Sequence, residues 1–522
     1  MPNESNPARP AASNSVREKM KSIAELAEIA RRARDNGQVV VLAHGVFDLV
    51  HMGHVRHLEA ARREGDILIV TTTADALVNR GPGRPIFTED LRAEMLGAIQ
   101  YVDWVGINQT PSAEETLEII RPNVYVKGSD YENPEDDVTG NIALERDAVE
   151  KFGGRLVLTK DITFSSSNLI NQYLNVYDHP LRDYLNTMRQ QDTADRVASL
   201  MDIIAKFRVL IIGDAIIDEY QYVNAMGKAA KEHIIATRFQ EQEIFAGGVL
   251  AAANNVANIC AEVEVVTMLG SGDEHEEFIR GALKSNITLT ALHRDGVPTT
   301  RKVRFIDPSY MRKLFEVYHF DDSPLSEDHE DTVNDIIRDR ASDFDLVIVT
   351  DYGHGLIGRS TIDLIVEKAR FLAVNAQTNS ANIGYNLITK YPSADFICID
   401  APEAHLATGD RFSDMEHIVT DKLSDMVDCG QIVVTHGKRG CMTYDHEAGV
   451  TNIPAFTKTV VDTVGAGDAF LSITAPLVAA GAPMDLAGFV GNAAGAMKVS
   501  IVGHRRSIER APLLKYITTL LK

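Results

Sequence analysis

The sequence has few cysteines and no long apolar segment. Its 522 residues include four cysteines, Cys260, Cys398, Cys429 and Cys441, and no two of them form a C-x-x-C pair. This usage indicates neither a zinc site nor a disulfide framework, so we expect a protein of the reducing cytoplasm. No apolar run approaches the roughly 20 residues that span a bilayer, so no contact with a membrane is expected.

The sequence also lacks an excess of positive charge. Lys and Arg together number 52, against 74 Asp and Glu, which gives a formal net charge of -22. Proteins that bind nucleic acid usually carry a basic excess or a basic stripe, so this balance argues against such a partner. A local basic pocket for a phosphorylated small molecule remains compatible with it.

The length and the residue patterns divide the chain into four segments. A chain of 522 residues is too long for one core. Residues 1–21 begin with the polar stretch MPNESNPARPAASNS and are expected to form a disordered tail rather than a signal peptide. Residues 22–177 and 207–522 each alternate strand and helix patterns, which predicts two α/β units with parallel sheets. Residues 178–206 lack strand signals and are expected to form a helical linker.

The first α/β unit opens on the stretch VVVLAHGVFDLVHMGHVRHL, from Val39 to Leu58. The apolar strand Val39–Ala43 runs into a Gly-bearing turn and then into a helix that carries His51 and His54. Such a turn binds phosphates at the carboxyl edge of a parallel sheet, because free backbone N–H groups and the helix dipole point at the ligand. Gly53 has no side chain that would keep a polyphosphate away from the two imidazoles.

The residues around this turn suit nucleotidyl transfer. That reaction builds charge on the α-phosphate, and positioned donors such as His51 and His54 stabilise it. Gly45 permits the turn, and Asp48 either orients it or binds metal. Four downstream cations are candidates for holding the triphosphate or the acceptor phosphate: Arg80, Arg84, Arg92 and Lys127.

Four ordered motifs of this unit resemble the cytidylyltransferase-like nucleotidyltransferases. GVFDLVHMGHVRHL is similar to their G-x-F-D-x-x-H-x-G-H signature, and RPIFTEDLRAEMLGAIQYVDWV, VKGSDY and FSSSNLIN follow in family order. The likeness is greatest to the adenylyltransferase half of the bifunctional heptose kinase/ADP-heptose synthases. The resemblance implies a Rossmann-like domain in which His51, His54 and Lys127 are catalytic and the nucleotide is bound by Gly45, Phe47, Asp48, Arg92, Ser165, Ser166 and Ser167.

Plainer interpretations exist for the same residues. His51 and His54 could serve only to cap the helix, and Ser165 to Ser167 could form an N-cap cluster, although capping and phosphate binding do not exclude each other. Arg80 and Arg84 could be solvated loop charges.

The second unit carries the stretch DTVGAGDAF, from Asp462 to Phe470. Two glycines before an acid at the start of a helix let backbone N–H groups form an anion-binding cradle for a transferring phosphoryl group. Asp468 stands where it can take the proton from an attacking hydroxyl. Asp468 could also be a helix-capping acid without a catalytic part.

From Phe207 to about the C-terminus, this unit resembles the ribokinase-like (PfkB) sugar kinases, whose signature is D-T-x-G-A-G-D. The resemblance implies an α/β domain with a small β lid, Mg²⁺ and ATP as cofactors and no direct protein ligand to the metal. It implies Asp468 as the catalytic base and Gly465, Ala466 and Gly467 as the anion hole. Sugar binding is expected of Asp214, Asp218, Gly247, Gly248 and Asn254, and nucleotide binding of Thr435, Gly437, Gly440 and Asn492.

Three features depart from the heptose enzymes. Where those relatives have an Asp-Pro-Lys stretch, residues 373–382 read AVNAQTNSAN without a cation. The segment Gly227–His233, expected to face the sugar, also differs. The transferase unit precedes the kinase unit, which reverses the domain order of the heptose enzymes. Because each domain folds on its own core, this change alters how the two domains are linked and not the chemistry of either.

These observations predict a bifunctional enzyme of nucleotide-sugar biosynthesis. Its C-terminal half would phosphorylate a sugar or sugar phosphate from ATP, and its N-terminal half would join a nucleoside triphosphate, with ATP favoured, to a sugar phosphate and release pyrophosphate. One alternative is a CTP-dependent transferase for a polyol or sugar phosphate. Another is a nucleotide-binding regulatory protein with one inactive domain. A homodimer is expected, since ribokinase-like enzymes often dimerise through the lid sheet.

Overall fold

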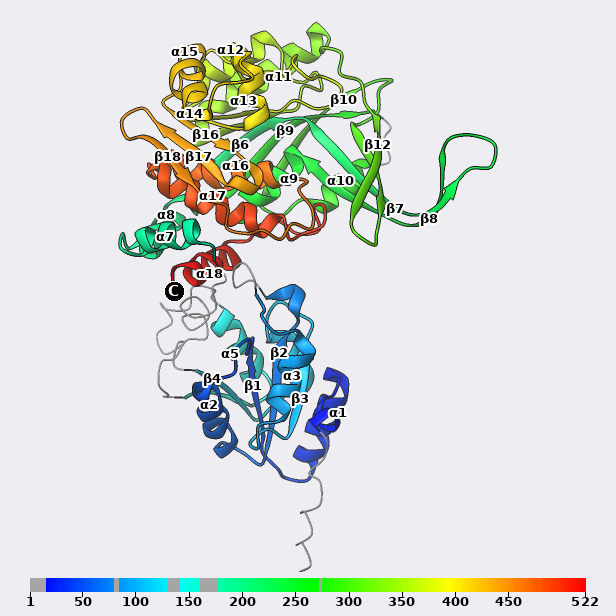
Figure 1. The fold of residues 1–522 in the computed structure, drawn as a ribbon, viewed down its shortest axis with the longest axis vertical. Coiled ribbons are helices and arrows are strands. Elements are labelled where there is room, and N and C mark those ends of the chain that lie inside the picture. Colours follow the sequence, from blue (N-terminus) through cyan, green and yellow to red (C-terminus); the bar gives the residue numbers. More distant parts are fainter. Residues whose placement is uncertain (1–15, 79–83, 129–140, 160–176, 272–274) are drawn as a thin grey trace, which may run out of the picture. The chain divides into compact units, whose positions relative to one another are not determined.

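The computed structural model describes residues 16–78, 84–128, 141–159, 177–271 and 275–522. The chain forms two compact units (Figure 1). Unit 1 comprises Met1–Asp178 with Leu514–Leu520 and Lys522, and unit 2 comprises His179–Leu513 with Leu521. No helix in the described ranges is both long enough and apolar enough to cross a bilayer.

Unit 1 is built on a five-stranded parallel sheet of order β3-β2-β1-β4-β5. Alternate residues of its strands pack on opposite faces, so Val41 and Ala43 enter one apolar core while Val40 and Leu42 enter the other. The strand order reverses between β1 and β4, which is where open α/β sheets bind ligands. The strands are β1 Val40–Gly45, β2 Ile67–Thr73, β3 Trp104–Asn108, β4 Val124–Gly128 and β5 Arg155–Thr159.

Helices cover both faces of this sheet. The regular ones are α1 Ile23–Asp35, α2 Met52–Arg63, α3 Glu89–Gly97, α4 Glu114–Ile120 and α5 Asn141–Glu150, with short 3₁₀ turns η1 Val16–Lys19 and η2 Asp75–Leu77. Within the segment expected as a disordered tail, residues 16–21 are ordered: they hold η1, and the N–H of Lys21 donates to the carbonyl of Val105 at the sheet edge (2.9 Å). Residues 1–15 lie outside the described ranges.

Unit 2 is built on a nine-stranded sheet of order β10-β9-β6-β13-β14-β15-β16-β17-β18. All neighbours are parallel except β17 and β18, which continue the sheet as antiparallel strands. The order reverses between β6 and β13, so the first strand of the unit lies beside its switch point. The strands are β6 Arg208–Gly213, β9 Glu262–Gly270, β10 Ile287–Arg294, β13 Leu346–Asp351, β14 Leu372–Ala376, β15 Phe396–Asp400, β16 Gln431–Thr435, β17 Cys441–Asp445 and β18 Gly449–Ile453.

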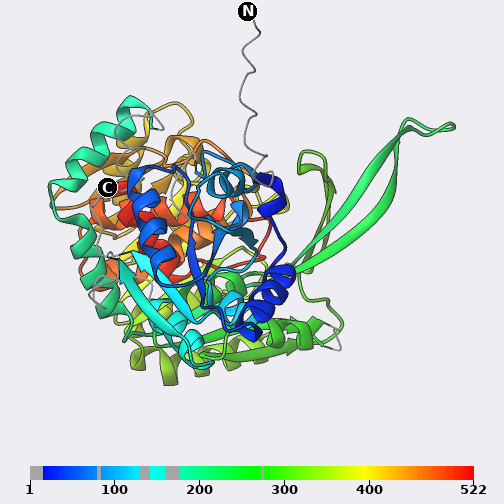
Figure 2. The ribbon, with the colours of Figure 1, turned by 90° about the horizontal axis from the view of Figure 1, so that it is seen from below.

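A second, four-stranded sheet of order β12-β11-β7-β8 forms the lid of unit 2. Its strands are β7 Ala215–Lys228, β8 Ile235–Gly248, β11 Arg301–Asp307 and β12 Arg312–His319. Figure 2 shows the β7–β8 hairpin projecting well beyond the rest of this unit. The segment Gly227–His233 forms the exposed tip of that hairpin, far along the strands from Asp218, and its expected role in facing the sugar stays a prediction.

The segment expected as a linker holds two helices that belong to unit 2, α7 His179–Arg189 and α8 Thr193–Ile204. One face of each helix is buried, with Leu181, Leu185 and Met188 in α7 and Val197, Met201 and Ile204 in α8. Tyr184 lies against the rings of Phe456 and Phe489. The other helices of the unit are α9 Val249–Val256, α10 His275–Ala282, α11 Glu327–Arg340, α12 Arg359–Lys368, α13 Ala401–Thr408, α14 Met415–His417, α15 Ser424–Met426, α16 Ala466–Ala479 and α17 Met484–Lys498. The last helix, α18 Arg510–Leu521, is divided between the two units.

Candidate active sites

The candidate site of unit 1 lies at the switch point between β1 and β4. Ala43 pairs with Val126, so the turn that follows Gly45 and Lys127, near the end of β4, meet at one edge of the sheet. Phe47 has a left-handed backbone (φ 50°), and its ring folds back to within 3.1 Å of where a Cβ on Gly45 would lie. A larger residue at position 45 would therefore displace the ring.

His51 and His54 cap the helix α2 with the same ring nitrogen. Nδ1 of His51 accepts the N–H of Gly53 (3.0 Å), and Nδ1 of His54 accepts the N–H of His51 (3.3 Å). A nitrogen that accepts carries no proton, so each neutral imidazole has its proton on Nε2. Nε2 of His51 is buried and has no partner among the described residues, and burial lowers the pKa of this histidine. Capping and donation therefore use different nitrogens.

The two rings lie side by side, with centroids 4.1 Å apart, and Phe47 meets His54 edge-on at 5.3 Å. This packing fixes the direction of both Nε2 atoms. The first turn of α2 thus combines a helix N-terminus with two positioned imidazole donors, which is what an oxyanion needs.

Arg92 and Asp48 stabilise the turn that follows Gly45 through hydrogen bonds to backbone groups. The guanidinium of Arg92 is fully buried and donates to the carbonyls of Val46, Phe87 and Thr73, the hydroxyl of Thr72 and the carboxylate of Asp75. Because a guanidinium has five N–H groups, this set uses them all. Asp48 accepts the N–H groups of Ile86 and Phe87 through Oδ1 (2.6 and 3.2 Å). The structure therefore places Arg92 as a scaffold of the turn.

Lys127 is buried beside the site and paired with Glu145 (3.0 Å), which also accepts the hydroxyl of Tyr125 (2.9 Å). A phosphate would have to compete with that carboxylate for the ammonium group. Ser165, Ser166 and Ser167 lie outside the described residues, as does Arg80.

The candidate site of unit 2 is organised by the start of α16. Gly465 is the N-cap residue with φ 74°, and a Cβ there would lie 2.4 Å from Cε1 of His504. Ala466 and Gly467 form the first helical turn, and Asp468 follows in it. Only glycine fits position 465, both for its backbone and for the space that the imidazole leaves.

Asp468 is buried at this helix start, and burial raises the pKa of its carboxyl. Its Oδ1 accepts the hydroxyl of Tyr352 (2.7 Å), a residue that follows β13. A buried carboxylate with a raised pKa and an aligned hydroxyl partner suits a general base, because a raised pKa increases its affinity for a proton.

Asp218 lies in a buried cluster of charges. It pairs with Arg304 of β11 and, through Oδ2, with Nε2 of His504 (3.3 Å). Burial raises the pKa of Asp218, but Arg304 and His504 outweigh burial, and the pKa lies well below its ordinary value. A Cβ on Gly247 would lie 2.0 Å from Oδ2 of Asp218, so β8 can pass this carboxylate only with a glycine.

Asp214 and Asn254, both predicted to bind sugar, are engaged in the protein. Asp214 directly follows β6 and accepts the N–H groups of Tyr352 (3.0 Å) and His354 (3.2 Å) through Oδ2. Burial and the nearby Asp351 raise its pKa to about 6. Asn254 donates to the carbonyl of Ala282 (3.0 Å) and accepts the N–H of Lys284 (3.1 Å). Gly248 has φ 57°, and a Cβ there would lie 2.5 Å from the carbonyl of Asp214.

The predicted nucleotide residues meet around the end of β18. Asn492 of α17 donates to the carbonyls of Ile453 (3.3 Å) and Pro454 (3.1 Å). Gly440, with φ 95°, approaches the same Ile453 carbonyl so closely that a Cβ would lie 2.0 Å from it. Thr435 ends β16, and Gly437 (φ 55°) lies in the turn between it and Gly440. The structure therefore brings these four residues to one end of unit 2.

An acidic pair at the start of α13 escaped the sequence analysis. Asp400 and Glu403 form a reciprocal capping box, and Glu403 also accepts the N–H of Thr378 (3.2 Å). Burial, Asp400 and Asp468 raise the pKa of Glu403 to about 8. The D-x-x-E spacing directly after an apolar strand was the signal available. In the described ranges, no three His, Cys, Asp or Glu side chains form a cluster that could hold a metal ion.

Two family models match this chain. One, described as pfkB family carbohydrate kinase, matches residues 206–511, and one described as cytidylyltransferase-like matches residues 42–172. Among curated proteins, the bifunctional protein HldE of Syntrophotalea carbinolica is 36% identical over 160 residues, covering 30% of this chain and 31% of that protein. The HldE of Citrifermentans bemidjiense is 24% identical over 311 residues, covering 59% and 63%. Each of these matches spans less than two thirds of the relative's length.

Solved structures similar to this chain include a mutant of phosphofructokinase-2 from Escherichia coli, with a TM-score of 0.49 and 14% identity over 60% of this chain and 100% of that one. A ribokinase from Arabidopsis thaliana, in complex with ribose and ATP, gives a TM-score of 0.46 and 17% identity over 61% and 99%.

Unit 2 has the fold of the ribokinase-like class of α/β kinases. It combines a mainly parallel sheet with a small β lid, and its helix α16 begins at a glycine and carries a buried acid in its first turn. With a family model that covers more than half of its length, the chain belongs to the pfkB family of carbohydrate kinases. Unit 1 is a Rossmann-like domain that matches the cytidylyltransferase-like model, so the order transferase then kinase is confirmed.

Proposed function

We propose that this chain is a bifunctional enzyme of nucleotide-sugar biosynthesis. Unit 2 phosphorylates a sugar or sugar phosphate from ATP with Mg²⁺, and unit 1 transfers a nucleotidyl group from ATP to a sugar phosphate and releases pyrophosphate. The observation that carries this proposal is the placement of Asp468 at the glycine-bearing start of α16, with the matching placement of the Nε2 atoms of His51 and His54 at the start of α2.

In the kinase reaction, Asp468 takes the proton of the attacking hydroxyl. The Tyr352 hydroxyl that now donates to this carboxylate keeps it aligned, and the substrate hydroxyl would share or replace that hydrogen bond. The first turn of α16 receives the transferring phosphoryl group. Asp400 and the buried Glu403 would hold the water shell of the Mg²⁺ that comes with ATP, and the ion would neutralise phosphate charge.

Lys302 of β11 favours a substrate that already carries an anionic group. Its side chain is only 7% exposed, and the contacts described for its ammonium are with the rings of Tyr318 (5.3 Å) and Tyr352 (6.0 Å), with no carboxylate partner among the described residues. Burying a cation without a carboxylate in contact is costly, and a phosphate on the substrate would offset that cost. This supports a sugar phosphate over a plain sugar.

In the transferase reaction, the Nε2–H groups of His51 and His54 donate to oxygens of the nucleotide phosphates. Charge grows on these oxygens as pyrophosphate leaves, so fixed donors lower the barrier without reorganising. The resemblance to the HldE proteins supports an ADP-sugar product. Residues 373–382 differ from the Asp-Pro-Lys stretch of the heptose enzymes, so heptose is not assumed to be the substrate. It is one of the sugars to be tested.

The experiment that tests both halves offers a panel of sugars and sugar phosphates with ATP to the purified full chain, and each nucleoside triphosphate with sugar phosphates and inorganic pyrophosphatase. Phosphorylation of one panel member and phosphate release with ATP support the proposal. Strict use of CTP would favour the alternative, a cytidylyltransferase for a polyol or sugar phosphate. Nucleotide binding without turnover would favour the regulatory protein.

We also propose that the enzyme is a homodimer formed through the lid sheet. The outer part of the β7–β8 hairpin exposes Met226, Ile235 and Phe239, and β12 exposes Phe315 and Val317. An apolar surface of this kind marks an interaction site.

A further inference from the structure

The turn that follows β13 presents a buried imidazole without a partner. His354 is 7% exposed, and neither Nδ1 nor Nε2 has a hydrogen-bond partner among the described residues. Burial lowers the pKa of His354 to about 4, and nearby Lys302 contributes to the same shift, so the ring is neutral near pH 7. Native proteins rarely leave buried polar side chains unpaired, and each exception needs an explanation.

Side chains from two segments hold the turn Tyr352–His354 through several hydrogen bonds. Asp214 accepts the N–H groups of Tyr352 and His354, while Asn379 and Asn382 both donate to the carbonyl of Tyr352 (2.9 Å each). Gly353, with φ 70°, leaves room for Asn382, whose Nδ2 would lie 2.4 Å from a Cβ there. A turn fixed by this many side chains holds the imidazole in one place.

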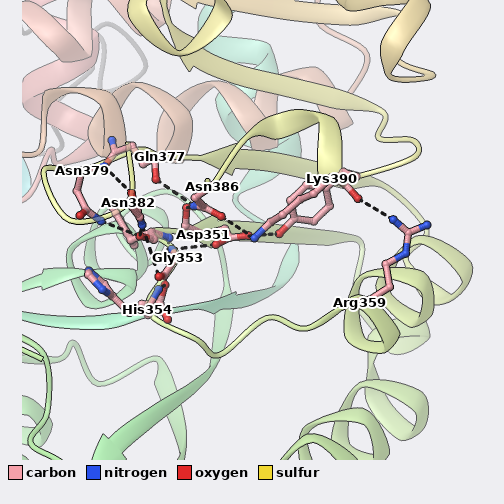
Figure 3. Close-up of polar contacts among 12 residues, drawn as sticks. Asp351, Gly353, His354, Arg359, Gln377, Asn379, Asn382, Asn386 and Lys390 are labelled. Carbon is pink, nitrogen blue, oxygen red and sulfur yellow. Dashed lines mark hydrogen bonds and ion pairs between the residues drawn. The ribbon is translucent and has the colours of Figure 1, made fainter. Parts of the chain in front are cut away.

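The segment Gln377–Asn386 that supplies these amides also ties the turn to the sheet. Asn386 donates to the carbonyls of Asp351 (2.9 Å) and Gln377 (3.0 Å), and Lys390 pairs with Asp351. Figure 3 shows this network, with His354 at the end opposite to Lys390 and Arg359. The segment includes part of the stretch, residues 373–382, that departs from the Asp-Pro-Lys stretch of the heptose enzymes.

The surroundings of the imidazole connect it to the reacting atoms. Two residues earlier, Tyr352 donates its hydroxyl to Asp468. Phe320, at the end of the lid strand β12, lies with its ring 5.5 Å from the imidazole. His354 therefore lies between the carboxyl edge of the sheet and the lid, in the turn that contacts the proposed base.

We propose that His354 is a specificity-determining residue of the kinase unit, whose imidazole hydrogen-bonds a hydroxyl of the sugar substrate other than the one that is phosphorylated. This inference rests on the proposed function. A neutral imidazole offers one donor and one acceptor, and a sugar hydroxyl is both an acceptor and a donor, so the two groups are complementary. Binding of the sugar would give a hydrogen-bond partner to one of the two ring nitrogens that are unpaired in its absence.

The test uses the full chain and the panel member that it phosphorylates with the highest kcat/KM. We expect His354→Leu to lower kcat/KM for that sugar at least tenfold, mainly through KM, to leave KM for ATP unchanged and to keep or raise Tm, because leucine removes an unpaired polar group. His354→Gln should restore part of the activity, since its amide can also donate and accept. His446→Leu, at an exposed position of the same unit, is the matched control.

A second measurement identifies the hydroxyl. Among the monodeoxy analogues of the sugar, we expect one that costs the wild type at least tenfold in kcat/KM and costs His354→Leu less than twofold. If His354→Leu has wild-type kinetics, the inference is overturned and the proposed function stands. The same holds if the substitution impairs KM for ATP and lowers Tm as much as it impairs use of the sugar. A wild type that phosphorylates no member of the panel overturns the proposed function and the inference with it.

Discussion

At the scale of single residues, His51 illustrates how one side chain serves two purposes. Its Nδ1 caps α2, and its Nε2 is left for a ligand. The structure is therefore compatible with two roles for this histidine, helix capping and donation to a phosphate. Substitutions can separate the two roles.

We predict that His51→Asn retains the helix cap and loses nucleotidyl transfer. Asparagine is among the best N-cap residues, so Tm should stay near the wild-type value, whereas nucleotidyl transfer should fall by roughly 10²- to 10³-fold, as for loss of one oxyanion donor. His51→Ala should lose both activity and about 1 kcal/mol of stability. Pyrophosphate release and thermal melting measure the two effects, and unchanged turnover in His51→Asn would refute the donor role.

Glu403 leads to a prediction about pH. Because its pKa of about 8 in the folded protein lies above its ordinary value, the folded state holds more protons than the unfolded chain between about pH 4.5 and 8. Stability therefore falls as the pH rises through this window. Without Mg²⁺, Glu403→Gln should remove that part of the decline, a slope of up to ~1.4 kcal/mol per pH unit.

Melting temperatures of the wild type and of Glu403→Gln across this pH range measure the difference, with Glu447→Gln at an exposed position as the control. Curves that run parallel for the wild type and Glu403→Gln would contradict the assignment. Added Mg²⁺ should reduce the difference if the ion lies near this carboxylate, because a cation favours the ionised form.

At the scale of helices and strands, the parts nearest the chemistry were predictable from the sequence. The strand expected at Val39–Ala43 was found as β1, because strand and turn signals are local. The partners of the site residues were not. Arg304 lies 86 residues from Asp218, and Tyr352 lies 116 residues from Asp468, so only the folded sheet and lid bring them together.

Arg92 shows a different limit of sequence reasoning. Its position in a family motif predicts a ligand contact, but a motif does not reveal whether the guanidinium points to the ligand or into the core. The structure uses all of its donors inside the protein. Similarly, residues 178–206 were expected to form a helical linker, whereas Leu181 and Leu185 of α7 are buried in unit 2, because composition alone does not distinguish a packed helix from a linker helix.

The β7–β8 hairpin allows a prediction about the homodimer. If the homodimer forms through the lid sheet, replacing Met226, Ile235 and Phe239 together by serine should convert it to a monomer, because these apolar side chains would lose their burial against the partner. Light scattering after size-exclusion chromatography measures the mass. Phe412→Ser removes an aromatic ring that is 92% exposed elsewhere in unit 2 and should leave the mass unchanged. A dimer that survives the triple substitution would place the interface elsewhere.

At the scale of the whole molecule, the two units carry separate cores and separate sites. We therefore predict that Asp468→Asn lowers phosphorylation by roughly 10²- to 10⁴-fold, as for loss of a general base, and leaves nucleotidyl transfer within about twofold of the wild type. His51→Asn should have the converse effect. Both activities are measured on the same preparation of each variant, and a substitution that abolishes both would contradict independent catalysis.

The use of Nδ1 by both capping histidines also has a spectroscopic consequence. An imidazole with a bare Nδ1 and a protonated Nε2 gives two well-separated nitrogen resonances, whereas an imidazolium gives two similar ones. Isotope-labelled His51 and His54 would therefore report nucleotide binding directly: the Nε2 signals should move as phosphate arrives, while the Nδ1 signals, anchored in the helix backbone, stay where they are.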